Sequence, residues 1–230
     1  FHTRKQQILS SLNSSDTNSR IDKSPKGSVD EAIIPLIELL NRHDDYVTTS
    51  SCSGRVSIYY DDELEVNEND VRHSMKGGGR WLYVTHSHID LPKENNKERL
   101  NEFLLKNIFD SDLYNALQDD NRIVYFKFEP MILHVEARTL DAAKNLLTSA
   151  IDTGYRESGL LTTAKRHMVV IRSSLKLDTP IARLDSTNHK LYLFVDLSYL
   201  YLLVTLSNQK FDENSRRMKE LYKKLEDHLF

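Results

Sequence analysis

The chain has 230 residues, of which 39% are hydrophobic and 28% charged, and its formal net charge is −3. It is long enough to bury a sizeable core, and no apolar run approaches the roughly 18 residues of a membrane span, so we expect no membrane partner. A single cysteine, Cys52, excludes an intramolecular disulfide and is typical of a reducing compartment, so we expect a cytoplasmic protein. Because the chain begins with Phe1 rather than methionine, we expect residues to precede it.

The first segments in chain order indicate a helix, a linker and a second helix. Residues 1–12 carry a modest helical pattern, and residues 13–27 form a polar linker rich in Ser and Asn. Ser28-Val29-Asp30-Glu31 has the composition of a capping box that begins a helix extending to about His43. Pro35 lies inside that pattern and should kink the helix or divide it.

The next stretch alternates between strands and highly charged segments. Residues 46–49 and 55–60 are predicted as strands on either side of a short turn, and residues 80–85 as a third strand. Residues 61–75 are predicted as an acidic mobile loop, and residues 93–121 as a helical insertion. Without the acids of that loop, the formal charge of the remaining residues is positive, so a basic face elsewhere on the protein is possible.

The second half of the chain predicts further strands and two helices. Residues 122–128 and 131–138 are expected as strands, and Pro130 between them should mark a bulge or a strand change because it lacks an N–H. A helix should extend from Thr139 or Leu140 to Thr153, with Gly154 just beyond its C-terminus.

The remaining elements complete the expected fold. Residues 166–173 are predicted as a strand, residues 181–184 and 190–195 as a hairpin, and residues 197–228 as one long helix. Together these elements indicate a single domain of mixed α+β class (α/β in the broad sense), with a mixed, largely antiparallel sheet covered by helices. No Gly-x-Gly-x-x-Gly follows a strand and opens a helix, so a doubly wound dinucleotide-type fold is not expected.

Three short segments look suited to a ligand rather than to packing: Ser50 to Arg55, Lys76 to Trp81, and Phe126 to Pro130. Four of the seven glycines fall in the first two, each of which also carries cations. Successive amides in a glycine turn can bind an anion, and the neighbouring Arg or Lys adds the countercharge. The alternative is a pair of hairpin loops with solvated charges.

Several side chains could carry chemistry, and each has a structural alternative. Cys52 could be a nucleophile beside Arg55, or a small thiol that lines a turn. Glu129 could bind a ribose or an amine, act as a base, or form a salt bridge. His86, His88 and His134 could meet on a sheet, but no known metal-binding motif surrounds them, so we expect no metal.

The ordered segments resemble the tRNA wybutosine-synthesising protein 3 family. The resemblance runs from about Ser28 to Asn214 and rests on five motifs in the same order. They are Ser50-Ser51-Cys52-Ser53-Gly54-Arg55, Lys76-Gly77-Gly78-Gly79-Arg80-Trp81 with His86, Lys127-Phe128-Glu129-Pro130, Ile132-Leu133-His134-Val135, and Ala150 to Gly154 followed by Arg156-Glu157-Ser158-Gly159.

This resemblance implies an S-adenosylmethionine-dependent methyltransferase with an unusual mixed-sheet fold. Its substrate would be a 4-demethylwyosine-type base, methylated on a ring nitrogen, next to the anticodon of phenylalanine tRNA. Two rivals remain: a non-catalytic RNA-binding module, and a metal-dependent hydrolase built on the three histidines. A monomer is favoured over an oligomer.

Under that interpretation, the candidate residues fall into three groups. The expected cofactor-binding residues are Ser51, Cys52, Ser53, Gly54, Arg55, Gly77, Gly78 and Gly79. The expected acid–base or base-orienting residues are Glu129, His134 and His86. The expected RNA-binding residues are Lys76, Arg80, Trp81, Arg156, Lys165 and Arg166. Which of the two glycine-containing segments takes the cofactor and which the RNA stays open.

Overall fold

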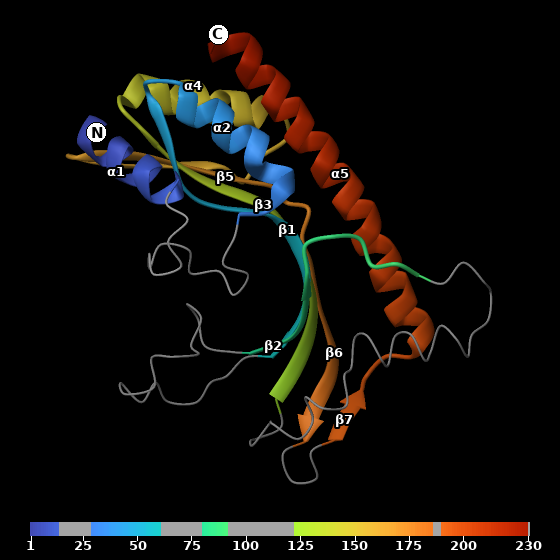
Figure 1. Cartoon of the computed structure of the whole chain (residues 1–230). Coiled ribbons are helices and arrows are strands. Elements are labelled where there is room, and N and C mark those ends of the chain that lie inside the picture. The colour runs from blue at the N-terminus through green and yellow to red at the C-terminus, as the bar shows by residue number, and fades with distance from the viewer. Residues whose placement is uncertain (14–28, 61–79, 92–121, 186–189, 230) are drawn as a thin grey trace, which may run out of the picture. The chain divides into compact units, whose positions relative to one another are not determined.

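The computed structural model describes residues 1–13, 29–60, 80–91, 122–185 and 190–229 (Figure 1). These residues divide into two compact units. Unit 1 comprises Phe1–Gly54, Pro130–Leu175 and Asp212–Phe230, and unit 2 comprises Arg55–Glu129 and Lys176–Phe211. The predicted acidic loop at 61–75 and helical insertion at 93–121 lie outside the described residues.

The strands form an open sheet in which every pairing of known register is antiparallel. They are β1 (Tyr46–Tyr60), β2 (Arg80–Thr85), β3 (Arg122–Ala137), β4 (Gly159–Thr163), β5 (Arg166–Arg172), β6 (Leu177–Asp185) and β7 (Lys190–Leu193). The order is β2-β1-β3-β5-β4, with β6 also pairing with β3, and β7 with β6. The predicted α+β class with a largely antiparallel sheet is confirmed.

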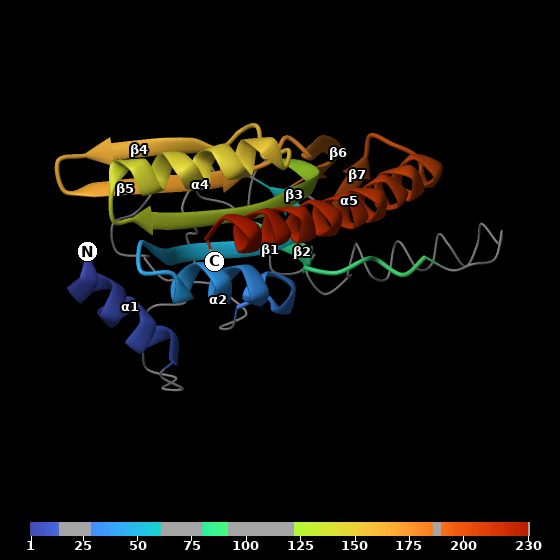
Figure 2. The same ribbon diagram turned by 90° about the horizontal axis from the view of Figure 1, so that it is seen from above.

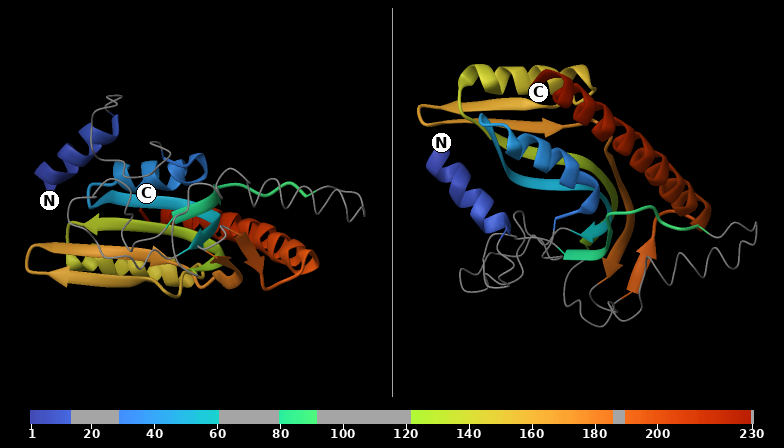
Figure 3. Two further views of the ribbon diagram at one scale, coloured as in Figure 1. Left: turned by 90° about the horizontal axis from the view of Figure 1, so that it is seen from below. Right: turned by 45° about the horizontal axis from the view of Figure 1, so that its top comes forward.

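In unit 1, helices pack on a sheet formed by parts of β1 and β3 together with β5 and β4. The helices are α1 (His2–Asn13), α2 (Ile34–Arg42), α4 (Leu140–Asp152) and the C-terminal part of α5 (Leu197–Leu229). Figures 1 and 2 show α4 lying along the β4–β5 hairpin, as does the left view of Figure 3. The core joins residues of α2, β3, α4, β5 and α5, among them Leu40, Leu133, Leu146, Val169 and Leu221, each at most 1% exposed.

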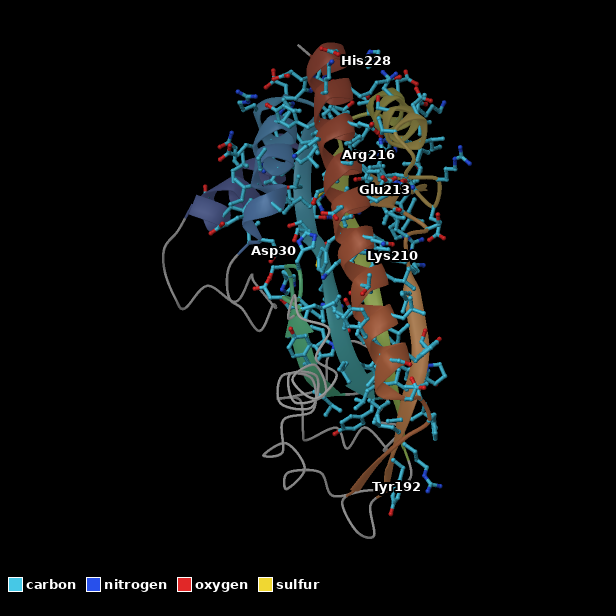
Figure 4. The ribbon with its side chains drawn as sticks, turned by 90° about the vertical axis from the view of Figure 1, so that its right-hand side faces the viewer. Asp30, Tyr192, Lys210, Glu213, Arg216 and His228 are labelled. Atoms are coloured by element: carbon cyan, nitrogen blue, oxygen red, sulfur yellow. The ribbon has the colours of Figure 1, made fainter. Side chains whose placement is uncertain are left out.

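The turn after α4 is held by side chains of α5. Thr139 caps the start of α4 by accepting a hydrogen bond from the Ala142 N–H, and Gly154 follows its end with φ of 93°. Arg217 donates to the Gly154 carbonyl at 3.1 Å and to Glu213 at 2.7 Å. The arginines Arg216 and Arg217 lower the pKa of Glu213 to about 2 (Figure 4). The predicted helix and its glycine terminus are confirmed.

Pro35 divides the first predicted long helix. A 3-10 turn, η1 (Glu31–Ile33), precedes α2, and Pro35 lies in the first turn of α2, where its missing N–H costs nothing. Asp30 stands at the N-cap position without capping the helix, because its carboxylate binds Ser53 instead. The predicted division is confirmed, and Ser28, the first residue of the expected capping box, lies outside the described residues.

In unit 2, the N-terminal part of α5 packs on β3. Phe128 meets Phe211 edge to face, with ring centroids 4.9 Å apart. The Asn208 side chain accepts from the Ile89 N–H at 3.0 Å and donates to the Ile89 carbonyl at 2.9 Å, which ties the segment after β2 to α5. The stretch from Leu197 is helical, as predicted. Among the described residues, no helix is long and apolar enough to cross a membrane.

Two predicted breaks in the sheet have different outcomes. The turn expected between residues 49 and 55 is wrong, because β1 is continuous and accommodates Gly54 at a φ of 115°. The change predicted at Pro130 is confirmed: β3 pairs with β6 up to Phe128 and with β5 from Ile132. The short strand β4 was not predicted, since it follows the turn-like residues 156–159.

Candidate functional site

Arg55 of the first ligand-like segment contacts one residue from each of the other two segments, and all three residues belong to unit 2. The Arg55 Nε lies 2.6 Å from the Glu129 Oε2, and the Arg55 guanidinium carbon lies 4.4 Å from the centre of the Trp81 ring. The Arg55 side chain is 25% exposed and the Glu129 side chain 47%. A cation, an anion and a large aromatic surface are therefore presented together at an accessible position.

Strand alternation explains why these side chains share a face. On β3, Phe126 and Phe128 are fully buried, so Glu129 projects to the opposite side of the sheet. On β1, Arg55 reaches Glu129 on that same side. Trp81 on β2 is the cross-strand partner of Tyr59 on β1, so the two side chains stand on one face.

The first segment contributes a buried structural network as well as Arg55. The Asp30 Oδ2 accepts hydrogen bonds from the Ser53 N–H at 2.9 Å and from the Ser53 hydroxyl at 3.0 Å. The Asn214 side chain donates to the Ser53 carbonyl at 2.8 Å and accepts from the Met131 N–H at 2.9 Å. Since the Ser53 amide serves a carboxylate of the protein and the backbone there is extended, the expected anion-binding turn does not form at this residue. Ser53 is only 4% exposed.

The other members of the first segment lie along β1. Ser51 and Cys52 are partly exposed, and Gly54 is buried. Cofactor binding by Ser51 and Cys52 stays a prediction. The positive φ of Gly54 explains why a glycine is needed at that position. The glycines of the second segment, Gly77, Gly78 and Gly79, lie with Lys76 outside the described residues.

The two candidate histidines have different settings. His134 lies on β3 in unit 1, where its Nδ1 is 2.9 Å from the Ser50 hydroxyl and its carbonyl accepts from Thr49. His86 belongs to unit 2 and follows the end of β2 at Thr85. The expectation that His86 and His88 lie on a strand is therefore wrong. A proton-transfer role for either candidate stays a prediction.

The predicted RNA-binding residues are distributed over both units. Arg80 begins β2 and Trp81 follows it. Arg156 is exposed in the turn after α4, and Lys165 is exposed between β4 and β5. Arg166 donates two hydrogen bonds, at 3.2 and 2.9 Å, to the buried carboxylate of Glu136, so the protein already supplies it with a partner.

Two tyrosines beside the Arg55 cluster, Tyr59 and Tyr125, were not selected from the sequence, and Lys127 was selected only as a member of the third segment. Lys127 places its ammonium 4.8 Å from the Tyr59 ring centre and 5.2 Å from that of Tyr125. The alternation Tyr125-x-Lys127-x-Glu129 on a predicted strand was the signal that could have identified this face.

The Arg55 cluster suits recognition of a planar group with an adjoining charge. A guanidinium held by a carboxylate keeps a fixed orientation, and its remaining N–H groups can bind an anion. An aromatic ring stacked on a guanidinium is a surface on which an unpaired base can also stack. The Arg55 cluster is therefore a candidate site for a nucleotide or a similar ligand.

Comparison with known proteins identifies the family. The model of the family described as methyltransferase TYW3 matches residues 3–227. The chain is 39% identical to "tRNA wybutosine-synthesizing protein 3" of Saccharomyces cerevisiae over 236 aligned residues, covering 100% of this chain and 82% of that protein. It is 36% identical to the homologue of that protein in Mus musculus, covering 90% of this chain and 69% of the relative. The chain belongs to the TYW3 methyltransferase family.

A solved structure shares the fold. The PH1069 protein of Pyrococcus horikoshii OT3 aligns over 99% of this chain and 94% of its own, with a TM-score of 0.68 and 26% identity. The family membership predicted from the ordered motifs is confirmed, as is an α+β fold that is not of the doubly wound type.

Proposed function

We propose that the chain is an S-adenosylmethionine-dependent tRNA methyltransferase of wybutosine synthesis. The substrate is a 4-demethylwyosine-type base next to the anticodon of phenylalanine tRNA, and the acceptor is a ring nitrogen of that base. The match to a methyltransferase family over residues 3–227 carries the proposal. The relatives named for tRNA wybutosine synthesis support the substrate.

The chemistry needs alignment more than activation. Methyl transfer from a sulfonium to nitrogen is an in-line displacement: the nitrogen–carbon bond forms as the carbon–sulfur bond breaks, and S-adenosylhomocysteine leaves. Holding the two reactants in register supplies much of the rate. A rigid strand pair with an oriented charged group meets that requirement better than a mobile loop.

The Arg55–Glu129–Trp81 cluster supports a binding role in this reaction. Arg55 can bind an anionic group of the cofactor or the RNA, with Glu129 fixing its direction, and Trp81 can stack on the tricyclic base or on a neighbouring base. His86 and His134 remain proposed proton acceptors. Ser51, Cys52 and the Gly77–Gly79 segment remain proposed cofactor contacts.

A cytoplasmic setting is part of the proposal. The single cysteine supports a reducing compartment.

Mass spectrometry of phenylalanine tRNA tests the reaction. In a strain lacking this protein, we expect a wybutosine precursor lighter by one methyl group to accumulate. Adding the purified protein and S-adenosylmethionine to that tRNA should restore the methyl group. An unchanged wybutosine content in the deletion strain, with no methyl transfer in vitro, would exclude the proposed function.

A further inference from the structure

The sheet in unit 2 has one face that packs on α5 and one that does not. On β3, the residues facing the core are fully buried, and those alternating with them are partly exposed. The buried set is Val124, Phe126 and Phe128, and the partly exposed set is Ile123, Tyr125, Lys127 and Glu129. Phe128 packs against Phe211 of α5, so Tyr125 and Lys127 project away from that helix.

Aromatic rings from three neighbouring strands stand on this second face. Trp81 of β2 is opposite Tyr59 of β1 in the register. Lys127 of β3 contacts the rings of both Tyr59 and Tyr125. The rings of β2, β1 and β3 therefore stand on one face, with Arg55 and Lys127 against them.

The face continues into β6 and β7. Arg183 is paired with Ile123 of β3, on the same side as Tyr125. Its guanidinium lies 5.5 Å from the ring centre of Tyr192, which is 41% exposed and labelled on β7 in Figure 4. A fourth cation–ring pair thus extends the face beyond the Arg55 cluster.

We infer that this face, which we call the aromatic face, binds the unpaired nucleotides that flank the target base in the tRNA. It consists of Arg55, Tyr59, Trp81, Tyr125, Lys127, Arg183 and Tyr192. The inference rests on the proposed function, because it assigns the anticodon-loop contacts of the same enzyme.

The pairing of each ring with a cation favours single-stranded RNA as the ligand. A base can stack on a ring whatever its sequence, while the adjoining Lys or Arg neutralises the phosphate that accompanies it. Among the described residues, two acids pair with cations of this face: Glu129 binds Arg55, and Asp178 lies 3.5 Å from Lys127. The three cations of the face exceed these two acids, which suits a polyanion. A duplex would hide its bases from the rings.

The experiment compares two RNA ligands against ring variants. The full-length protein is titrated with a fluorescent anticodon stem-loop and with a fully paired duplex of the same length. The test variant is Tyr59→Leu combined with Tyr125→Leu, and the corresponding double Phe variant keeps both rings. Tyr201→Leu is the matched control, because Tyr201 is 39% exposed on α5.

We expect the double Leu variant to bind the stem-loop at least about tenfold more weakly, with duplex affinity unchanged. The double Phe variant and Tyr201→Leu should bind like the wild type. Melting temperature and S-adenosylmethionine affinity serve as readouts of folding and of the cofactor site, and both should be unchanged.

Two results would overturn the inference. One is an unchanged stem-loop affinity in the double Leu variant, and the other is an equal loss for stem-loop and duplex. If the wild type still methylates precursor tRNA in either case, the proposed function stands without the aromatic face. If the wild type transfers no methyl group, the proposed function fails as well.

Discussion

The two units contain similar ion pairs in different surroundings. In unit 1, the Glu136 side chain is 2% exposed and pairs with both Arg166 and Arg4. In unit 2, the Glu129 side chain is 47% exposed and pairs with Arg55 beside Trp81. A buried carboxylate needs its partners for the fold to persist, whereas an accessible pair contributes little stability and remains open to a ligand.

The same division runs through one short segment. Ser53 is buried in unit 1, where Asp30 and Asn214 use its amide, hydroxyl and carbonyl groups. Arg55, two residues later, belongs to unit 2 and is partly exposed. A motif that resembles a binding loop in sequence is therefore half structural anchor and half candidate site.

The largest effect is expected from removing the accessible cation. Arg55→Ala should slow single-turnover methyl transfer to precursor tRNA about 100-fold, because a reactant would lose its alignment. The free energy of unfolding should change by less than about 1 kcal/mol. Arg138→Ala is the control, since Arg138 forms a comparable partly exposed ion pair with Asp45. Loss of a reactant's alignment should slow transfer about 100-fold. A rate for Arg55→Ala within about twofold of the wild-type rate, far from the roughly 100-fold loss, would therefore show that Arg55 is not part of the site.

The buried network of unit 1 should show the opposite pattern. Asn214→Leu leaves the Met131 N–H and the Ser53 carbonyl without their partner, which should lower the free energy of unfolding by about 2–4 kcal/mol. Urea denaturation measures the loss, and Gln209→Leu at an exposed position of α5 is the control. A loss below about 1 kcal/mol would contradict a structural role for this network.

A smaller loss of stability is expected at the buried ion pair. Arg166→Gln should lower the free energy of unfolding by about 1–3 kcal/mol, less than for an isolated buried pair because Arg4 still faces Glu136. Arg138→Gln should cost at most about 1 kcal/mol in the same urea assay. If both variants lose the same stability, burial does not distinguish the two pairs.

Arg166→Gln also tests the predicted RNA contact. Removing a phosphate-binding cation lowers the salt dependence of tRNA binding by about one unit of slope. An unchanged salt dependence of tRNA binding would contradict an RNA contact by Arg166 and leave only its ion pair with Glu136.

The smallest effect is expected at alkaline pH. Burial, with a further contribution from Asp45, raises the pKa of Tyr46 to about 12, and its hydroxyl donates to the Ala142 carbonyl at 3.0 Å. An unfolded tyrosine titrates near a pKa of about 10, so the unfolded state loses a proton first and the free energy of unfolding falls as pH rises from about 10 to about 12.

Tyr46→Phe removes this proton. Denaturant unfolding measures the free energy of unfolding of the wild type and of Tyr46→Phe at each pH. The difference between the two should be constant below about pH 9, and above it the wild type should lose stability relative to Tyr46→Phe. Parallel pH profiles for the two proteins would contradict the assignment.

The sequence predicted the elements whose signals are local. Thr139 and Gly154 delimit α4 through their own backbone preferences, and Pro130 marks the partner change on β3 because it lacks an N–H. The continuous path of β1 was missed because the Ser-rich segment resembles a turn. In the structure the Ser53 N–H is bonded by Asp30, 23 residues earlier, a contact that no local pattern predicts.

The site itself depends on contacts that local patterns do not encode. Arg55 and Glu129 are separated by 74 positions, and their meeting follows from strand pairing. The three segments could be selected by composition, and the ordered motifs predicted the family. The shared face of the Tyr59, Trp81 and Tyr125 rings could not be predicted without knowing how β1, β2 and β3 pair.

The most direct test compares the two carboxylates. Glu129→Gln and Glu136→Gln are each measured for unfolding free energy and for single-turnover methyl transfer at a temperature at which both are folded. We predict that Glu129→Gln loses at least about tenfold in transfer rate with less than about 1 kcal/mol of stability, because its pair positions a reactant and is half exposed. Glu136→Gln should lose about 2–4 kcal/mol of stability and keep its transfer rate. The same pattern of losses in both variants would contradict the division between a structural and a functional ion pair.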